Sequence, residues 1–171
     1  REYLELQKGS YNIHMQAIML ANAASLNEEL LYSSDKALEL FPDSADIRFF
    51  RGIGLYQTFD YKELINNFQG VTHERYSSED YISQAKMLIA EAYYRLDDFV
   101  RSDSLFEDLI RNEPDNYMVL NNYSYYLAER GEKLDQAKKW SADVVKNNPG
   151  NATFLDTYAW VLYQLGYFEE A

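Results

Sequence analysis

Histidine and cysteine, which supply many of the nucleophiles, general bases and metal ligands of proteins, are almost missing from this sequence. It has no cysteine, and neither of its two histidines, His14 and His73, has a second histidine at ligand spacing. A lone histidine is more often a surface or partly packed side chain than a metal ligand or a general base. We therefore expect no metal site, no thiol chemistry and no catalytic residue.

The stretches that come nearest to cofactor or catalytic motifs have simpler structural explanations. The two glycines of "RGIGLYQ" fall inside a helix-periodic stretch, where close packing of two helices explains them better than a phosphate-binding loop. The acidic steps "DDF" and "FEE" fall at expected helix starts, where carboxylates favour the helix dipole. The sequence also lacks the P-loop, dinucleotide-binding, zinc-protease and nucleophile-elbow patterns. It predicts a protein that is not an enzyme and binds no cofactor.

The charge of the chain excludes further classes of partner. Its 171 residues include 16 Lys and Arg against 28 Asp and Glu, a formal net charge of −12, and no basic run occurs. Such a chain is a poor ligand for nucleic acid or for anionic membranes. No apolar run approaches the ~18–20 residues of a membrane-spanning helix. We therefore expect a globular chain, without direct membrane insertion, that binds proteins or peptides.

Three prolines mark a repeat in the elements that must position any binding surface. They occur in "ELFPDS", "RNEPDN" and "KNNPGN", each after an apolar-periodic stretch and before residues that can cap a new helix. Pro114 and Pro149 are 35 residues apart, and Pro42 and Pro114 are 72 apart, about twice that distance. Such a period is typical of a solenoid of paired helices. It predicts helix pairs at 11–24 with 27–41, 44–57 with 60–72, 80–96 with 99–112 and 115–129 with 132–147, and then a first helix at 151–165.

Two further kinds of residue recur in phase with the prolines. An aromatic residue follows the inner turn in "YQTFDYKEL", "YRLDDFVRS" and "YQLGYFEEA" and is expected to fasten the second helix to the first. Small residues recur where a first helix should cross its partner, because a small side chain lets two backbones approach. A four-helix bundle, the alternative fold, does not require these positions in register. The aromatic positions are Tyr61, Phe99 and Phe168, and the small ones are Gly52, Ala90, Ser124 and Ala159.

This pattern resembles the tetratricopeptide repeat (TPR) family, whose repeats read W-x2-L-G-x2-Y, then A-x3-F, then P. The second repeat departs from the pattern at Arg48 and Arg51, where apolar residues are usual, and in its longer loop, "THERYSSED". The first repeat is the weakest match and retains mainly Ala37 and Pro42. The other matching positions are Ile89, Ala90, Tyr93, Phe106 and Pro114 in the third repeat, Leu120, Tyr123, Ser124, Leu127, Ala137 and Pro149 in the fourth, and Leu155, Tyr158, Ala159, Leu162 and Ala171 in the fifth.

The resemblance covers essentially the whole chain and implies its architecture. The expected fold is all-α, a right-handed superhelical solenoid of helix-turn-helix repeats. We expect one TPR domain over 1–171, with repeats at about 11–44, 45–82, 83–116 and 117–151 and a partial repeat at 152–171. The apolar last stretch, "ATFLDTYAWVLYQLG", lacks a covering second helix. This predicts that the chain is a segment of a longer one or that another molecule covers the end.

In this family the first helices of successive repeats line a concave groove that binds an extended peptide or a helix of a partner. Carried onto this sequence, that face is rich in Tyr, Trp, Phe and Met, which bury a large area and are common in binding hot spots. The alternative is that many of these side chains pack between helices, as we expect for Phe106 and Trp140 on second helices. The predicted groove residues are Met15, Met19, Phe49, Ile53, Tyr56, Met87, Glu91, Tyr94, Asn121, Tyr125, Asp156, Trp160 and Tyr163.

The charge of this face predicts the character of the ligand. Family members that bind the acidic tails of chaperones present Lys, Arg and Asn to a carboxylate. Here Arg95 is the one candidate cation, while Glu91 and Asp156 face inward. The expected partner is therefore neutral or basic and partly apolar.

The predicted function is that of a non-enzymatic protein–protein interaction module, a scaffold or adaptor that binds its partner in the concave groove. Two alternatives stay open. The array can serve as a structural spacer or self-associate through its C-terminal end, or it can recruit substrates for a longer enzyme or regulator. The sequence most resembles bacterial TPR proteins, some of which are exported lipoproteins and some cytoplasmic, so both compartments stay open, with the cell envelope or periplasm slightly favoured over the cytoplasm.

Overall fold

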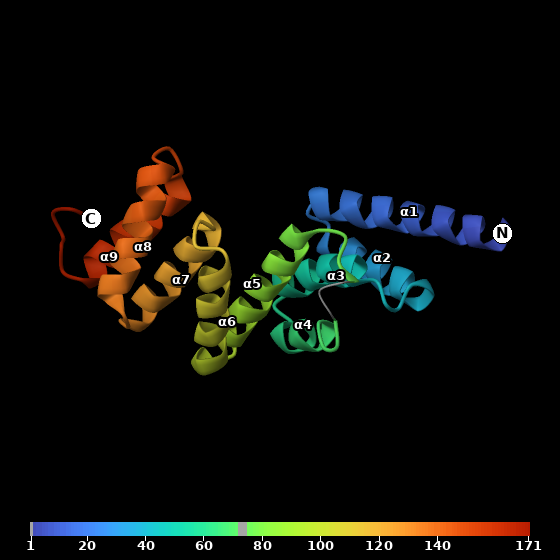
Figure 1. The fold of residues 1–171 in the computed structure, drawn as a ribbon, viewed down its shortest axis with the longest axis horizontal. Helices are drawn as coiled ribbons and strands as arrows, with labels where there is room; N and C mark the ends of the chain where they lie inside the picture. Colours follow the sequence, from blue (N-terminus) through green and yellow to red (C-terminus); the bar gives the residue numbers. More distant parts are fainter. Residues whose placement is uncertain (1, 72–74) are drawn as a thin grey trace. The chain divides into compact units, whose positions relative to one another are not determined.

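The structure, a computed structural model, describes residues 2–71 and 75–171, with side chains from residue 10 onward. His73 lies outside the described residues. The chain divides into two compact units, Arg1–Ser102 and Asp103–Ala171, and regular secondary structure in the described residues is helical (Figure 1). The helices are α1 (Glu2–Ala23), α2 (Asn27–Leu40), α3 (Ala45–Gln57), α4 (Tyr61–Asn67), α5 (Glu79–Arg95), α6 (Phe99–Asn112), α7 (Tyr117–Arg130), α8 (Leu134–Asn147) and α9 (Ala152–Gln164).

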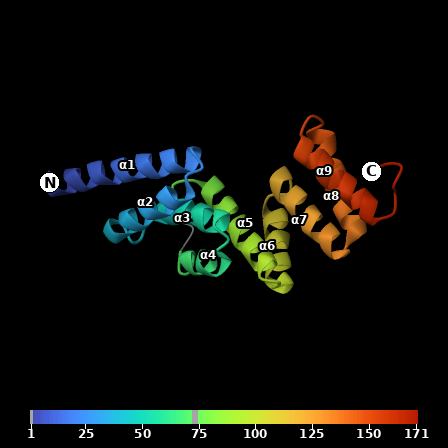
Figure 2. The same ribbon diagram turned by 180° about the vertical axis from the view of Figure 1, so that it is seen from behind.

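In unit 1, each helix packs on its neighbours along the chain. Helix α1 contacts α2 and α3, and α3 contacts α2, α4 and α5. Both ribbon views show α1 running along α2 and α3, and α4 lying on the other side of α3 (Figures 1 and 2). Four fully buried aliphatic side chains from four helices form the centre of this unit's core: Ile18, Leu30, Ile47 and Leu64.

In unit 2, α7 and α8 form a hairpin that packs on α9. The side chain of Asn116 accepts a hydrogen bond from Val119 N at the start of α7, and Asn151 caps α9 in the same way through Phe154 N. Each asparagine stands two residues after a repeat proline, so the proline ends one helix and the asparagine begins the next. The α7–α8 turn is closed by Gly131, whose φ of 67° is costly for residues with a Cβ atom.

The observed helices confirm the predicted all-α repeat fold, with two marked differences in length. Most boundaries lie within two residues of the predicted ones, but α1 begins at Glu2 and not at residue 11, and α4 ends at Asn67 and not at residue 72. The two arginines that depart from the repeat pattern help to explain this early end. Arg48 donates to the carbonyl oxygen of Asn67 (3.0 Å), and Asn67 Nδ2 donates to the carbonyl oxygen of Arg48 (2.7 Å). These bonds fasten the last residue of α4 to α3.

The two glycines of α3 lie at close contacts between helices, as predicted. A Cβ atom at Gly52 would stand 2.5 Å from the Phe68 ring, and one at Gly54 would stand 2.9 Å from Leu31 Cδ2. A methyl group at either position would force its neighbour to move. Close packing therefore explains "RGIGLYQ".

The predicted aromatic contact is present at all three turns, but only Tyr61 and Phe99 begin a second helix, whereas Phe168 lies in a turn after α9. Each aromatic residue contacts a tyrosine five positions earlier, near the end of the first helix. The ring centroids are 5.8 Å apart for Tyr56 and Tyr61, 5.4 Å for Tyr94 and Phe99, and 5.3 Å for Tyr163 and Phe168. Phe106, which is fully buried, and Trp140, which is partly buried, pack on Tyr123 as expected for core residues.

Candidate protein-binding surface

In unit 1, most of the predicted groove residues are enclosed by neighbouring helices. Phe49 is only 2% exposed, and its ring stacks on that of Tyr81 with centroids 4.6 Å apart. The carboxylate-bearing side chain of Glu91 is also buried, at 6% exposure. Of this group, Met19 is the one whose side chain is half exposed, at 50%. The partly buried members are Met15, Ile53, Tyr56, Met87 and Tyr94, the first three of which pack against the core of the unit.

In unit 2, the corresponding face of α7 and α9 is more open. An aromatic row, defined as Trp160, Tyr163 and Phe168, runs from partly buried to exposed side chains. The Trp160 and Tyr163 rings stack with centroids 5.6 Å apart and planes 9° apart, and Tyr163 meets Phe168 edge to face. Tyr163 is 53% exposed and Phe168 is 67% exposed. Large aromatic surface that stays in contact with water is available to a partner.

Two polar atoms on this face lack hydrogen bonds. Asn121 Oδ1 on α7 and Trp160 Nε1 on α9 are both shielded from solvent, and neither has a hydrogen-bond partner among the described residues. A buried donor or acceptor without a partner costs about 1–3 kcal/mol, and folded proteins leave few of them. One atom is an acceptor and the other a donor, which are the two kinds of group that a peptide backbone complements.

Tyr125 of α7 and its neighbours complete this face. Tyr125 is partly buried, and its hydroxyl donates to Glu129 Oε1 at 2.9 Å. Asp156 on α9 is exposed. The prediction omitted two residues of the same helical stripe, Met118, which is 49% exposed, and Glu129. Their spacing from Tyr125, seven and four residues, is the signal that places them on its side of the helix.

The opposite side of α7 is held by a charged cluster. Lys133 Nζ donates to Glu107 Oε1 at 2.7 Å, and this hydrogen bond lowers the pKa of Glu107 and raises that of Lys133. Arg130 pairs with Asp103 at 2.7 Å. Burial raises the pKa of the Tyr123 hydroxyl, which lies within hydrogen-bond reach of Glu107 (3.4 Å). The cluster keeps α7 fixed against its neighbours while the face with Tyr125 stays accessible.

The described residues offer little for other chemistry. No group of three or more His, Cys, Asp or Glu side chains with the arrangement of a metal site occurs among them. His14 is partly buried beside the Phe41 ring, at 6.3 Å between centroids, as expected for a partly packed histidine. Within the same described part of the chain, no helix combines the length and apolar character that crossing a membrane requires.

Comparison with solved structures shows where this arrangement of helices recurs. The MamA protein superposes with a TM-score of 0.70 at 12% sequence identity, covering 94% of this chain and 85% of MamA. A second MamA structure, MamA AMB-1, gives a TM-score of 0.67 at 14% identity, covering 97% and 93%. YrrB, described as a TPR protein with an unusual peptide-binding site, gives 0.66 at 19% identity, covering 91% and 76%.

Comparisons at the level of sequence found no match. No protein-family model matches the chain, and no curated protein matches it. The structural neighbours are TPR proteins, and their likeness extends over more than nine-tenths of this chain. The chain therefore has the helical-repeat fold of the TPR proteins.

Proposed function

We propose that this chain is a non-enzymatic protein-interaction module that binds a peptide or helix of a partner on the α7–α9 face of unit 2. We define this face by Met118, Asn121 and Tyr125 of α7, by Asp156 of α9, and by the aromatic row. The observation that carries the proposal is the pair of buried polar atoms without partners, Asn121 Oδ1 and Trp160 Nε1. Their cost in the free protein is recovered if a ligand supplies the missing hydrogen bonds.

An exposed side chain lies against one of these two groups. The Tyr163 ring stacks on the Trp160 indole and is itself 53% exposed. Exposed side chains change rotamer rapidly, so Tyr163 can move aside when a ligand docks beside the indole. An incoming backbone carbonyl then accepts from Trp160 Nε1, and the tyrosine ring packs against the ligand.

The charge of the face supports a neutral or basic partner. Asp156 and Glu129 are both exposed on it, and Arg130 at the end of α7 is already paired with Asp103. An acidic ligand is repelled here, whereas Lys or Arg of a partner gains an ion pair. The described peptide-binding site of YrrB shows that a related fold can hold a peptide, which supports a peptide as the ligand class.

The test is selection of peptides from a random displayed library against the whole chain, followed by fluorescence anisotropy with the selected peptides. We expect peptides that contain an aromatic or aliphatic residue near Lys or Arg. Tyr163→Ala should raise the Kd by at least about tenfold, as truncation of a hot-spot residue does.

The matched control is Tyr32→Ala on α2 of unit 1, which removes a tyrosine that is 61% exposed. It should leave the Kd unchanged. Selected peptides that bind Tyr163→Ala as tightly as the unaltered chain contradict the proposal, and so does a library that yields no binder.

A further inference from the structure

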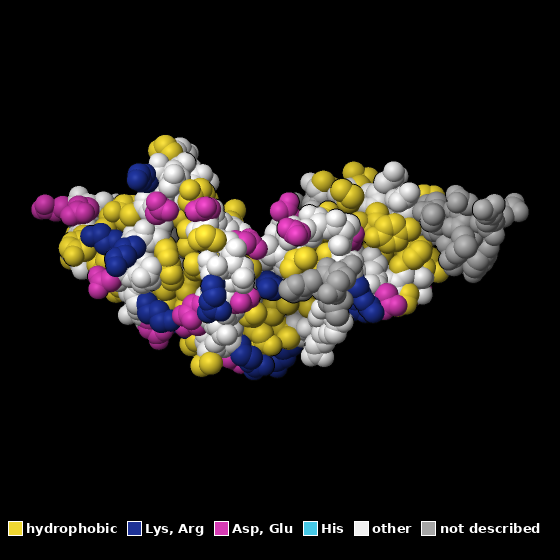
Figure 3. Space-filling view, viewed as in Figure 1, with side chains coloured by type: hydrophobic (Ala, Val, Ile, Leu, Met, Phe, Trp, Pro, Cys, Tyr) yellow, Lys and Arg dark blue, Asp and Glu magenta, His cyan; other side chains and the backbone are white. Residues whose placement is uncertain are grey.

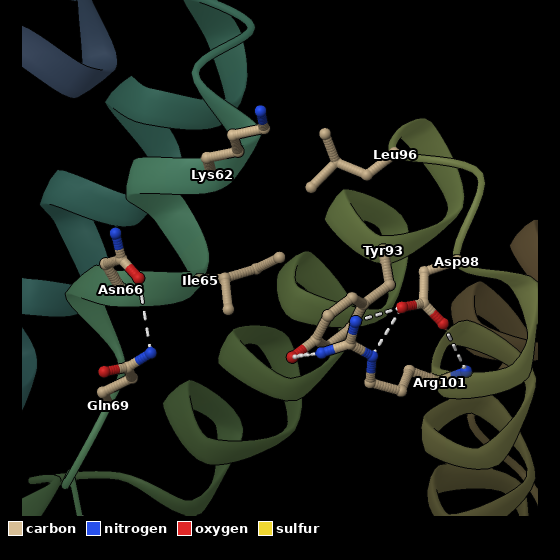
Figure 4. A pocket seen from close by; sticks show the side chains of 8 residues that line it. All are labelled: Lys62, Ile65, Asn66, Gln69, Tyr93, Leu96, Asp98 and Arg101. Atoms are coloured by element: carbon tan, nitrogen blue, oxygen red, sulfur yellow. Dashed lines mark hydrogen bonds and ion pairs between the residues drawn. The ribbon is translucent and has the colours of Figure 1, made fainter.

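A second candidate site lies within unit 1. It is a cavity of about 480 Å³ between α4 and the turn that joins α5 to α6. This volume is within the range of small-ligand sites, about 300–1,000 Å³. Figure 4 shows that one wall comes from α4 and the other from the end of α5 and the first turn of α6. The lining residues are Lys62, Ile65, Asn66, Gln69, Tyr93, Leu96, Asp98 and Arg101.

The early end of α4 shapes this cavity. Residues 68–71, which were predicted to belong to the helix, do not continue it, since Phe68 turns toward Gly52 and Gly70 takes a φ of 72°. As a result Gln69 leaves the helix and forms a hydrogen bond from Nε2 to Asn66 Oδ1 at 3.3 Å. The two amides form one rim of the cavity (Figure 4).

The opposite wall is a fixed charged cluster. The Arg101 guanidinium lies over the Tyr93 ring, 4.5 Å from its centroid, and donates to the Tyr93 hydroxyl at 3.4 Å. Asp98 pairs with the same guanidinium and also accepts from the backbone N–H of Arg101 at 3.2 Å. A stacked, doubly hydrogen-bonded arginine loses little freedom when a ligand binds.

Lys62 gives the cavity its net charge. Among the described residues, Lys62 forms no hydrogen bond or ion pair, and Asp98 is the one acidic side chain in the lining. With Arg101 and Asp98 compensating each other, the lining keeps one positive charge in a chain whose formal net charge is −12. In the space-filling view, Lys and Arg side chains gather beside hydrophobic ones along the lower edge between α4 and the C-terminal end of α5 (Figure 3).

We propose that this cavity binds an acidic, partly apolar peptide segment of a partner protein, in which an aliphatic residue stands next to Glu or Asp. The carboxylate pairs with Lys62, and the aliphatic side chain packs on Ile65 and Leu96, while the Asn66 and Gln69 amides hydrogen-bond its backbone. The ligand has the opposite charge preference to that of the α7–α9 face. One module then holds two segments of different charge, independently of whether the α7–α9 face binds its own ligand.

The experiment uses the whole ¹⁵N-labelled chain and a capped dipeptide, N-acetyl-Leu-Glu-amide, added to about 10 mM because weak sites have Kd values near 1 mM or above. We expect the backbone resonances of Lys62, Ile65, Leu96 and Arg101 to shift. The neutral dipeptide N-acetyl-Leu-Gln-amide should bind about threefold more weakly, which is the scale of an exposed ion pair. N-acetyl-Glu-amide, which lacks the leucine, should bind more weakly than the Leu-Glu dipeptide.

Two variants make the test decisive. Lys62→Gln should abolish the difference between the Leu-Glu and Leu-Gln dipeptides, while Lys139→Gln, an equal charge change at an exposed lysine of α8 in unit 2, should leave it intact. The proposal is overturned if the acidic dipeptide perturbs other parts of the chain instead, if both dipeptides bind equally to the unaltered chain, or if Lys62→Gln keeps the preference. Because no residue of the α7–α9 face is changed, failure here leaves the peptide-selection result unaffected.

Discussion

Two asparagines, one in each unit, are buried to the same extent but differ in their hydrogen bonds. Asn67 in unit 1 and Asn121 in unit 2 are each 3% exposed. Asn67 donates from Nδ2 to the Arg48 carbonyl oxygen at 2.7 Å and accepts at Oδ1 from Arg51 at 3.4 Å. Asn121 donates to Asn122 Oδ1 at 3.2 Å, but its own Oδ1 has no partner among the described residues. The paired asparagine connects α4 to α3, whereas Asn121 has a buried acceptor without a partner, which we propose a ligand satisfies.

The aromatic residues of the two first-helix faces differ in the same way. In unit 1, Phe49 is enclosed by Tyr81 and Phe50. In unit 2, Tyr163 stacks on Trp160 but keeps half of its surface exposed. First-helix aromatic residues are therefore part of the core in unit 1 and half exposed in unit 2, and the local packing decides which.

The largest expected effect comes from truncating one aromatic residue in each unit. Phe49→Ala should lower the free energy of unfolding by about 3–5 kcal/mol, since it removes a buried ring and leaves a cavity. Tyr163→Ala should lower it by less than about 1 kcal/mol, because the ring is half exposed. Urea denaturation followed by circular dichroism measures both. If Phe49→Ala keeps the stability but loses peptide binding, Phe49 belongs to a binding face and the contrast between the units disappears.

The next largest effect is a difference in stability between leucine variants of the two asparagines. Asn67→Leu should cost about 2 kcal/mol, because it removes a satisfied side chain and leaves the backbone carbonyl of Arg48 without its donor. Asn121→Leu should be neutral or stabilising by up to about 1 kcal/mol, because an acceptor without a partner is replaced by an apolar group of similar size. The same denaturation experiment applies. Equal losses in the two variants would show that Asn121 is as well satisfied as Asn67.

A smaller loss of stability is expected from crowding the close contact between α3 and the Phe68 ring in unit 1. Gly52→Ala places a methyl group 2.5 Å from the Phe68 ring and should destabilise the chain by about 1–2 kcal/mol. The control is Gly150→Ala, where an added Cβ meets nothing within 4 Å. Thermal melting of both variants measures the difference. If Gly52→Ala and Gly150→Ala melt at the same temperature, the Phe68 ring can move away from α3 without a loss of stability.

The smallest effect is a pH dependence that arises in unit 1. Burial, with the nearby charge of Asp46, raises the pKa of Tyr76 to about 12. An unfolded tyrosine ionises near pH 10, so this contribution to stability is complete below pH 10 and is lost as the pH rises from 10 to 12. Between pH 8.5 and 10.5 we expect a loss of ~1 kcal/mol from this group. Tyr76→Phe should show a smaller loss than the unaltered chain over that interval, and parallel pH profiles would contradict the assignment.

The repeat pattern predicted the helices well because it depends on local chemistry. Prolines end three of the helices, asparagines begin α7 and α9, and small residues allow the crossings, so many of the boundaries are marked in the sequence. The end of α4 could not be predicted in this way. It depends on hydrogen bonds between Arg48 and Asn67, 19 residues apart, and the arginine signalled only that the usual pattern was broken.

The sequence could predict which helix face the candidate site residues lie on, but not which of them are exposed to solvent. The repeat register places Phe49 and Trp160 on the predicted groove face of their helices, and the sequence does not show that the Tyr81 ring covers Phe49. The unpaired atoms of Asn121 and Trp160 are properties of the packed structure. The cavity beside Lys62 is another such property, because it exists only where a shortened helix meets the next hairpin.

The most direct test of the central proposal is to observe the Trp160 indole while a selected peptide binds. The chain has two tryptophans, so a ¹⁵N-labelled sample gives two indole N–H resonances, and Trp140 on α8 serves as the internal reference. We expect the Trp160 resonance to move downfield as its N–H gains an acceptor, while the Trp140 resonance stays in place. A peptide that saturates the protein without moving the Trp160 resonance would contradict the central proposal.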